Sequence, residues 1–270
     1  MGILEAIILG IIQGLTEFLP VSSSGHLELG KALFGEDGIP EEGLLFSVIL
    51  HTATALSTVV VYRKAILELL QGLFKFNWND ETKYVALIAV SMIPVAVVGL
   101  MFESQIEVLF TANLSLVGAM LLVTSALLFF THFAKVQEGS MTFGKSFIIG
   151  ISQAIAVLPG ISRSGSTIAT ALLLGISKEK AAKFSFLMVL PPILGAAALK
   201  FKDYLEAPTA EVTSDSTAMI FGFVAAFVAG LAACTWMIKI VKKAKLSYFA
   251  IYCALAGIFA IVYGSFILTQ

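Results

Sequence analysis

Long uninterrupted runs of apolar residues follow one another along the whole chain. A run of about 20 apolar residues is long enough to cross the hydrocarbon core of a bilayer as an α-helix. Helices are expected because the bilayer core has no water to satisfy unpaired backbone groups. We therefore predict an all-α integral membrane protein with six transmembrane helices, near residues 44–62, 84–102, 113–133, 183–200, 217–239 and 247–268.

Two further apolar segments are interrupted, and each piece is too short to span the bilayer. Residues 2–34 contain P-V-S-S-S-G-H at 20–26, and residues 143–176 contain P-G-I-S-R-S-G-S-T at 159–167. Clusters of Pro, Gly and Ser end one helix and begin the next. Such a break at membrane depth is tolerated only where protein or a wet cavity surrounds it. We interpret both segments as re-entrant helix pairs that enter and leave on the same side.

The composition supports this class and excludes others. Of the 270 residues, 58% are apolar and only 13% are charged, and the mean hydropathy is +0.95. Soluble domains carry about 25% charged residues, so the shortfall excludes a disordered chain and argues against a soluble enzyme. No basic patch with interleaved aromatic residues is present, so we expect no nucleic-acid partner. Cys234 and Cys253 lie in apolar runs, where we expect small packing residues and no disulfide framework or zinc site.

The charged residues predict the orientation in the membrane. Six spans and two re-entrant pairs place 13 of the 17 Lys and Arg residues on one face, which the positive-inside rule makes cytoplasmic, with both termini outside. An eight-span topology would scatter these charges. The expected cytoplasmic residues are Arg63, Lys64, Lys75, Lys83, Lys135, Lys145, Lys178, Lys180, Lys183, Lys239, Lys242, Lys243 and Lys245. The opposite face receives Glu36, Asp37, Glu41, Glu42, Glu103, Glu107, Asp203, Glu206, Glu211 and Asp215, with only Lys31, Lys200 and Lys202.

The two halves of the chain resemble each other, which predicts a single membrane domain, 1–270, built from repeats 1–135 and 140–270. G-I-I-Q-G-L-T-E-F-L-P-V-S-S-S-G at 10–25 aligns with G-I-S-Q-A-I-A-V-L-P-G-I-S-R-S-G at 150–165, and shorter matches follow in the same order. Each half holds three spans, an odd number, so the second copy is expected to be inverted. Inverted repeats bring the tips of broken helices together near the midplane, where binding sites form.

The second break carries the residues that an anion needs. Arg163 is the one arginine outside the expected cytoplasmic loops, and burying it in a membrane costs roughly 3 kcal/mol or more, so a function is the default hypothesis. It begins a helix, where free N–H groups favour an anion. A planar cation with convergent donors suits a phosphate or pyrophosphate. The alternative is an N-cap with Arg163 paired to Glu17. The surrounding donors and small residues are Gly160, Ser162, Ser164, Gly165, Ser166 and Thr167.

The first break supplies complementary groups. Ser22, Ser23 and Ser24 can cap the following helix, and His26 lies in its first turn. Gln13 and Glu17 are four residues apart and so share one helix face. Glu17 or His26 can act as general acid or base, and a serine or His26 as a covalent nucleophile. For His26 the alternative is a buried histidine bonded to backbone. We expect His51 and His132 to be packing or interfacial residues.

These two motifs resemble those of the bacterial undecaprenyl-pyrophosphate phosphatase family, the bacitracin-resistance type. Q-G-L-T-E-F-L-P-V-S-S-S-G-H is similar to its first signature, and L-P-G-I-S-R-S-G-S-T to its second, a Pro-Gly-x-Ser-Arg-Ser-x-x-Thr pattern. The resemblance spans essentially the whole chain. Gln13 stands where many members carry a second glutamate, which weakens a mechanism or metal site that needs two carboxylates.

The resemblance implies hydrolysis of undecaprenyl pyrophosphate to undecaprenyl phosphate and inorganic phosphate, which recycles the lipid carrier for cell-wall synthesis and confers bacitracin resistance. It also implies a divalent cation, Mg²⁺ or Ca²⁺, which can simply accompany the diphosphate. The implied catalytic residues are Glu17, His26 and Arg163, to which we add Ser23, slightly favoured over His26 or water as nucleophile. The expected substrate-binding residues are Gln13, Ser22, Ser24, Gly160, Ser162, Ser164, Gly165 and Thr167.

We therefore expect a multi-pass enzyme of the bacterial inner (plasma) membrane whose site faces the outer, periplasmic side. Its partners are a polyprenyl pyrophosphate lipid and the bilayer, and a homodimer is left open. A secondary transporter or lipid flippase is the main alternative, because broken helices in inverted repeats are common there. The other membrane lipid-phosphatase superfamily needs a second catalytic histidine after the Ser-Arg element, and none follows Arg163.

Overall fold

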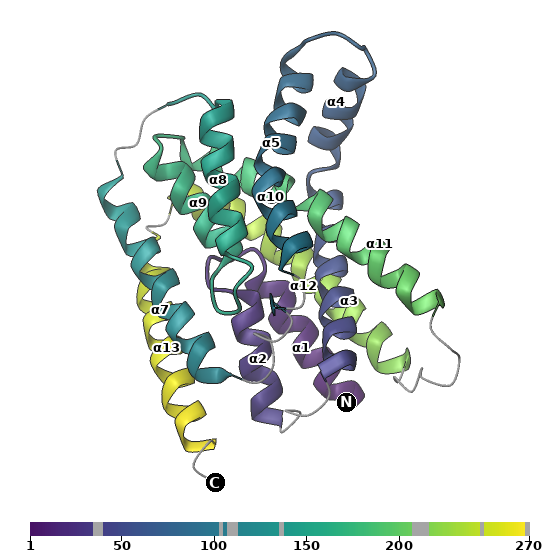
Figure 1. Cartoon of the computed structure of the whole chain (residues 1–270), viewed down its shortest axis with the longest axis vertical. Coiled ribbons are helices and arrows are strands. Elements are labelled where there is room, and N and C mark those ends of the chain that lie inside the picture. The colour runs from purple at the N-terminus through teal and green to yellow at the C-terminus, as the bar shows by residue number, and fades with distance from the viewer. Residues whose placement is uncertain are drawn as a thin grey trace.

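The computed structural model describes residues 1–34, 40–102, 105–106, 113–134, 138–206, 216–243 and 246–267. Within these residues the fold is all-α, as predicted (Figure 1), with one 3-10 turn, η1 (Thr131–Phe133), and an isolated bridge between Gly139 and Ile176. The helices are α1 (Ile3–Thr16), α2 (Ser23–Phe34), α3 (Pro40–Val61), α4 (Arg63–Leu73), α5 (Asp80–Met101), α7 (Leu114–Phe130), α8 (Phe143–Ile155), α9 (Arg163–Leu173), α10 (Lys178–Met188), α11 (Leu190–Glu206), α12 (Ser216–Lys243) and α13 (Ser247–Ile267).

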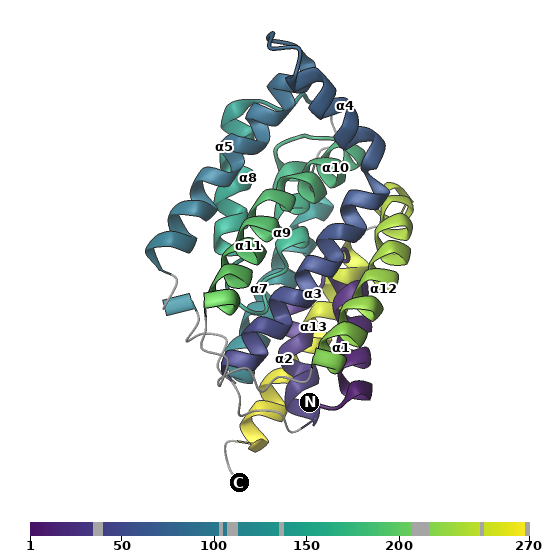
Figure 2. The same ribbon diagram turned by 90° about the vertical axis from the view of Figure 1, so that its right-hand side faces the viewer.

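Five of the six predicted stretches fall on helical segments that are long and apolar enough to cross a bilayer, and the stretch at 44–62 falls on α3. Among the described residues there are five such segments, and α3 with α4 forms a sixth if this pair, bent by 77°, counts as one span. The integral-membrane class is therefore confirmed. In Figure 2, α3 lies between α11 and α12, and it packs against both. The five segments are Asp80–Met101, Leu114–Phe133, Lys178–Leu199, Thr217–Val241 and Ser247–Ser265.

The stretch predicted at 183–200 differs in detail, because it consists of two helices. α10 ends at Met188, and α11 begins at Leu190. Pro191 and Pro192 then occupy the first turn of α11. Proline has no N–H to donate, so it is tolerated in the first turn of a helix but interrupts a continuous one. The interruption places Val189, Pro192 and Ile193 on the wall of the cavity described below.

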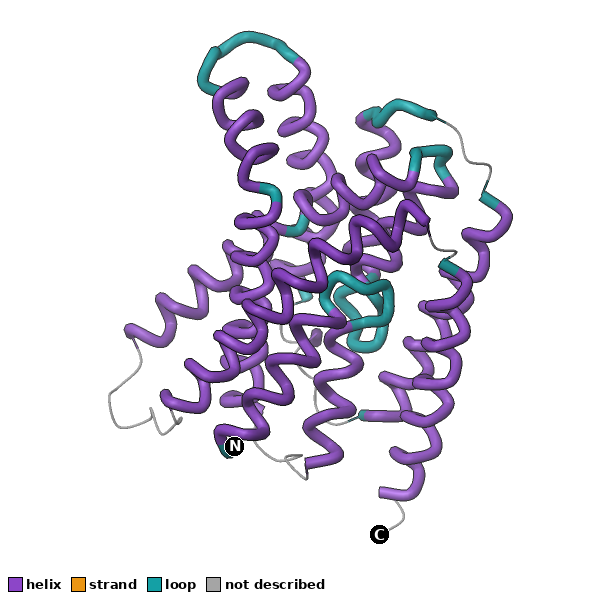
Figure 3. The backbone as a smooth tube through the Cα atoms, turned by 180° about the vertical axis from the view of Figure 1, so that it is seen from behind, coloured by secondary structure: helices purple, strands orange, loops and turns teal. Residues whose placement is uncertain are grey.

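Two helical hairpins, α1–α2 and α8–α9, fill the centre of the bundle. α1 and α8 are apolar helices of 14 and 13 residues, which are too short to cross a membrane. Figures 1 and 3 show the hairpins entering from opposite ends, with their loop tips near the middle of the molecule. α1 packs against α12, and α8 packs against α5. This arrangement is the one that an inverted repeat would produce, and the repeat itself stays a prediction.

Small residues allow both hairpins to approach their neighbours closely. A Cβ on Gly14 of α1 would lie 2.7 Å from the carbonyl oxygen of Ala226 in α12, and a Cβ on Gly150 of α8 would collide with the backbone of Ser91 in α5. Membrane helices associate largely through such close van der Waals packing, since lipid provides no hydrophobic drive between them. These glycines therefore fix the positions of the two hairpins in the bundle.

Hydroxyl groups link the helices through backbone carbonyls. Ser57 Oγ of α3 donates to the carbonyl of Phe227 at 2.8 Å, and Ser125 Oγ of α7 donates to that of Ala250 at 2.7 Å. Such interhelical hydrogen bonds are worth about 1 kcal/mol each in a membrane. Cys234 and Cys253 are buried and unpaired, as predicted for packing residues.

The start of α1 and the end of α13 lie at one end of the molecule, and the turn between α4 and α5 lies at the other (Figure 1). This agrees with an even number of crossings and two re-entrant hairpins, although the orientation in the membrane stays a prediction. Some residues that support it lie outside the described residues: Glu36, Asp37, Glu103, Glu107, Glu211 and Asp215 of the acidic set, and Lys135 and Lys245 of the basic set.

Candidate active site

Each hairpin turns through a short break and then starts a helix that a serine caps. Ser22 Oγ accepts a hydrogen bond from the backbone N–H of Gly25 at 3.2 Å, and Ser162 Oγ accepts one from that of Gly165 at 3.0 Å. These bonds satisfy backbone donors that a helix N-terminus leaves free. Ser23 and Arg163 follow the two caps, as the first residues of α2 and α9.

The two breaks contact each other, although about 140 residues separate them in the sequence. Ser164 Oγ donates to the carbonyl of Leu19 at 3.0 Å. Gly160, with φ of 95°, makes the turn before α9, and a Cβ on Gly25 would lie 3.2 Å from its Cα. Only glycine enters this backbone region without strain. The convergence that the sequence predicts is therefore present in the structure.

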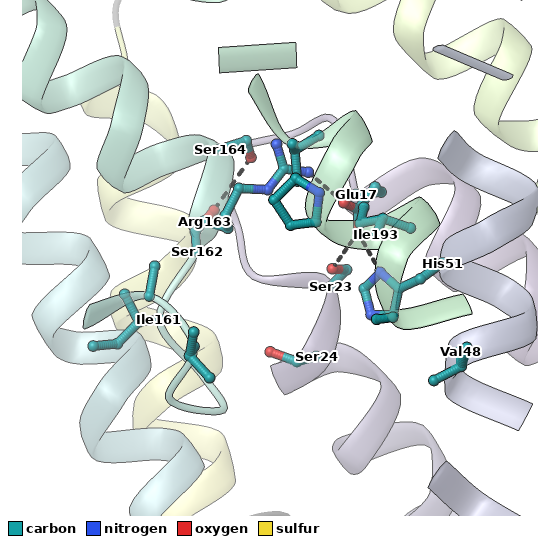
Figure 4. Close-up of a pocket in the computed structure, with 15 residues that line it drawn as sticks. Glu17, Ser23, Ser24, Val48, His51, Ile161, Ser162, Arg163, Ser164 and Ile193 are labelled. Atoms are coloured by element: carbon teal, nitrogen blue, oxygen red, sulfur yellow. Dashed lines mark hydrogen bonds and ion pairs between the residues drawn. The ribbon is translucent and has the colours of Figure 1, made fainter. Parts of the chain in front are cut away.

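Glu17 is the centre of the resulting cluster. Its Oε1 accepts a hydrogen bond from Arg163 Nη2, and its Oε2 accepts bonds from Ser23 Oγ at 2.8 Å and Gln13 Nε2 at 2.9 Å. His51 Nδ1 of α3 lies 3.2 Å from the same Oε2. The Glu17 side chain is 6% exposed, and Figure 4 shows Arg163, Ser23 and His51 pointing toward it. A buried carboxylate is stable when a cation and several donors surround it in this way.

A cavity of about 280 Å³ opens beside this cluster (Figure 4). One part of its wall is polar, with hydroxyls from α2 and α9 and the Glu17–Arg163 pair. The other part is apolar and comes mainly from the second break and α11. The lining residues are Glu17, Ser23, Ser24, Val48, His51, Ala156, Val157, Ile161, Ser162, Arg163, Ser164, Val189, Pro192, Ile193 and Ala196.

Half of the predicted site residues line this cavity, namely Glu17, Ser23, Ser24, Ser162, Arg163 and Ser164. The other six are not among the residues that line it: Gln13, Ser22, His26, Gly160, Gly165 and Thr167. Thr167, for example, is buried and its Oγ1 lies 2.6 Å from Ser185 Oγ of α10. The structure therefore gives these six residues supporting contacts rather than direct access to the cavity.

His26 has both ring nitrogens occupied. Nδ1 donates to the carbonyl of Ser22 at 2.7 Å, which leaves Nε2 to accept from the hydroxyl of Tyr252 in α13, also at 2.7 Å. The two rings stack with centroids 5.5 Å apart. Ser22 itself has φ of 71°, a conformation that non-glycine residues rarely adopt. His26 thus holds the strained turn directly before Ser23, and the backbone bond proposed as its alternative role is present.

His51 lines the cavity, so the prediction that it is a packing or interfacial residue was wrong. Besides the approach to Glu17, its Nδ1 is 3.0 Å from Gln13 Nε2. The available signal was its place in the middle of an apolar span, because an ionisable residue inside a membrane segment usually has a function. Arg163 is paired with Glu17, which is the contact expected if Arg163 has a structural role and binds no anion. However, both residues line the cavity, so an anion can reach the pair.

Comparison with known proteins places this architecture in a family. The model of the family described as "Bacitracin resistance protein BacA" matches residues 6–259. The chain belongs to the BacA family. It is 57% identical to the undecaprenyl-diphosphatase of Christiangramia forsetii, over 97% of this chain and 98% of that protein. The protein of the same name from Bacteroides thetaiotaomicron is 55% identical over 97% and 99% of the two chains, and that of Methanococcus vannielii 42% over 96% and 100%.

The BacA-family membership confirms the resemblance drawn from the two motifs, both of which lie within the matched residues. A resident metal finds little support in the residues around the cavity. Within the described part of the chain, no three His, Cys, Asp or Glu side chains come together as metal ligands would. Both oxygens of Glu17 already accept hydrogen bonds. The residues around the cavity therefore do not form a ligand set that would hold a cation on the protein.

Proposed function

We propose that this membrane protein hydrolyses undecaprenyl pyrophosphate to undecaprenyl phosphate and inorganic phosphate, recycles the lipid carrier of cell-wall synthesis and confers bacitracin resistance. The observation that carries the proposal is the meeting of Arg163, Glu17 and Ser23 at one cavity from two distant breaks. A cation, a base and a hydroxyl are what phosphoryl transfer to a side chain requires. Membership of the BacA family and the names of the relatives support this chemistry.

The diphosphate binds at the N-terminus of α9, against the side chain of Arg163 and the backbone N–H groups of the first turn. The guanidinium can hold two phosphate oxygens at once, and Ser162 and Ser164 add hydroxyl donors. The N-termini of α2 and α9 both favour a negative charge. The apolar wall around Ile161, Val189 and Ile193 suits the first units of the prenyl chain. The divalent cation that the family resemblance implies would enter with the diphosphate as its counter-ion.

Ser23 is the nucleophile. Its Oγ attacks the terminal phosphorus, its proton passes to Glu17 Oε2, and the bond to the bridging oxygen breaks to release undecaprenyl phosphate. Water then attacks the phosphorus of phosphoserine, which yields inorganic phosphate and restores the hydroxyl. Arg163 balances the charge on the transferred group. The hydrogen bond from Ser23 to Glu17 supports this choice over His26, whose ring nitrogens are both engaged. His26 instead maintains the Ser22 turn.

The site is expected to open to the outer, periplasmic side of the bacterial plasma membrane. The proposal depends on the charge distribution in the sequence, which makes the end with the α4–α5 turn cytoplasmic and the end with the termini external. The prenyl tail then stays among the helices in the bilayer while the diphosphate reaches the cavity. The protein can act as a monomer or as a homodimer in this scheme, because both motifs come from one chain.

Phosphate release by the purified protein in detergent tests the proposal, because a transporter has nothing to transport there. Wild-type protein should release phosphate from undecaprenyl pyrophosphate. Arg163→Lys should lower kcat about 10³-fold, because a point charge cannot replace the bidentate guanidinium. Ser23→Ala should abolish a phospho-enzyme that is trapped in the wild type.

Size-exclusion elution would verify that both variants remain folded, and His132→Asn, at an exposed position, serves as the unaffected control. Absence of phosphate release from the wild type under every ionic condition would leave the flippase or transporter as the better interpretation, which the paired broken helices also allow. Phosphate release with a phosphate on His26 would retain the activity but change the nucleophile.

A further inference from the structure

His51 has contacts that the mechanism above leaves unused. Its Nδ1 faces Glu17 Oε2 at 3.2 Å, and its side chain is 30% exposed at the cavity. Glu17 is the only carboxylate among the described residues that line the cavity. A carboxylate that is ion-paired to Arg163 and accepts two further hydrogen bonds is a poor place for a proton to remain. The proton taken from Ser23 therefore needs a second acceptor.

Gln13 holds Glu17 and His51, the two proton acceptors, next to each other. Its Nε2 carries two hydrogens, and it lies 2.9 Å from Glu17 Oε2 and 3.0 Å from His51 Nδ1. Its Oε1 is buried without a hydrogen-bond partner, so the amide is oriented by its donor side alone. An amide that donates to His51 Nδ1 requires the neutral ring, with the proton on Nε2. The lone pair of Nδ1 is then directed at the cluster around Glu17.

We propose that His51 acts through Glu17 as the final proton acceptor of a Ser23–Glu17–His51 relay, with Gln13 as the residue that positions the last two members. The inference rests on the proposed phosphatase function. As Ser23 Oγ bonds to phosphorus, its proton moves to Glu17 Oε2 and then to His51 Nδ1, and the carboxylate is charged again. When water attacks phosphoserine, the proton held by His51 returns through Glu17 to Ser23 Oγ, and both protons of the water leave with the phosphate as H2PO4−.

Among the described residues that line the cavity with His51, only Glu17 and Arg163 carry a charge. Glu17 of α1 faces His51 directly, and Arg163 of α9 lies on the far side of that carboxylate. α11 contributes Pro192, Ile193 and Ala196 to the same cavity, and none of them is charged.

The test compares His51→Asn, which keeps an amide at the position of Nδ1, with wild-type protein and His132→Asn. Wild-type kcat should fall as the pH is lowered, because a protonated His51 cannot accept the proton. His51→Asn should lower kcat about 10²-fold at pH 8, leave KM within about twofold, and lose that acid limb, so that the two enzymes converge at low pH. His132→Asn should keep the wild-type profile.

Chemical rescue separates proton transfer from packing. In His51→Ala, added imidazole can enter the vacated space beside the cavity and should restore kcat, whereas it should not restore Glu17→Ala. An acid limb that persists in His51→Asn, a loss confined to KM, or a failure of imidazole to rescue would each overturn the relay. A flat wild-type profile from pH 5 to pH 8 would overturn it without any variant. Absence of phosphate release by the wild type at every pH would instead contradict the proposed function.

Discussion

Ser22 shows how the strain of one residue supports the chemistry of the next. Its φ of 71° turns the chain sharply, and its hydroxyl caps α2 at Gly25. His26 returns to this turn through two bonds to the carbonyl of Ser22, from Nδ1 at 2.7 Å and from its backbone N–H at 3.2 Å. Strained residues persist only where the surroundings hold them, and they concentrate at functional sites. The turn directs Ser23 toward Glu17.

Ser22→Gly should therefore be milder than Ser22→Ala. Glycine adopts a positive φ at no steric cost and loses only a few tenths of a kcal/mol as a cap. Alanine loses about 1 kcal/mol of capping and keeps a left-handed strain of roughly 1–2 kcal/mol. Thermal unfolding in detergent should place Ser22→Gly level with or above the wild type, because glycine relieves the strain that Ser22 carries, and Ser22→Ala last. Ser22→Ala should also have the lower kcat of the two variants. Equal losses for the two variants would show that the hydroxyl matters and the backbone conformation does not.

At the scale of elements, short helices act as rigid arms that deliver the site residues. α8 carries the second break, and its position depends on Gly150, which lies against the backbone of Ser91 in α5. Ser146 of the same helix donates to the carbonyl of Leu87 in α5. A change in this contact would move Ser162 and Arg163 relative to Glu17. The packing of α8 on α5 is therefore coupled to the geometry of the active site.

Gly150→Ala should destabilise the protein and lower kcat together, because the added methyl group has no space against Ser91. Overpacking of this kind costs typically 1–3 kcal/mol. Gly144→Ala provides a matched control in the same helix, since a Cβ there would meet nothing within 4 Å. We expect Gly144→Ala to leave the unfolding temperature in detergent unchanged or slightly raised. Equal effects of the two substitutions would mean that α8 is not held by this contact.

At the scale of the whole molecule, two hairpins from opposite ends meet in the middle of a lipid-facing bundle. The outer surfaces of the long helices expose apolar side chains, for example Leu100 at 81% and Ile220 at 62%. Lipid tails can cover such surfaces, whereas the polar breaks are enclosed by protein. The bundle therefore supplies a polar chamber at membrane depth that a charged headgroup can enter from one side.

Single cysteines test which side that is. Ser24→Cys lies on the cavity wall, and Lys75→Cys lies in the exposed turn between α4 and α5. A membrane-impermeant maleimide should label Ser24→Cys in intact spheroplasts and Lys75→Cys only after permeabilisation. The native Cys234 and Cys253 are 0% exposed and should give little background. The reverse labelling pattern would place the cavity on the cytoplasmic side.

The class of the protein, the places where its helices break and the groups that meet there could all be predicted from the amino-acid order alone. Apolar runs and Pro-Gly-Ser breaks act locally, because each residue's preference for lipid, helix or turn depends on its near neighbours. Glu17, Ser23 and Arg163 could be selected for this reason, and so could the family.

Which side chains face the cavity and which support it depends on how distant helices pack against one another, so it could be seen only in the folded protein. His51 lies 34 residues beyond Glu17 on another helix, and Tyr252 lies 226 residues beyond His26. Their contacts depend on how α3 and α13 are rotated and shifted against their neighbours, and this depends on packing across the entire bundle. Periodicity within one helix contains no information about that rotation, so the proton acceptor behind Glu17 and the anchor of His26 emerged only from the folded chain.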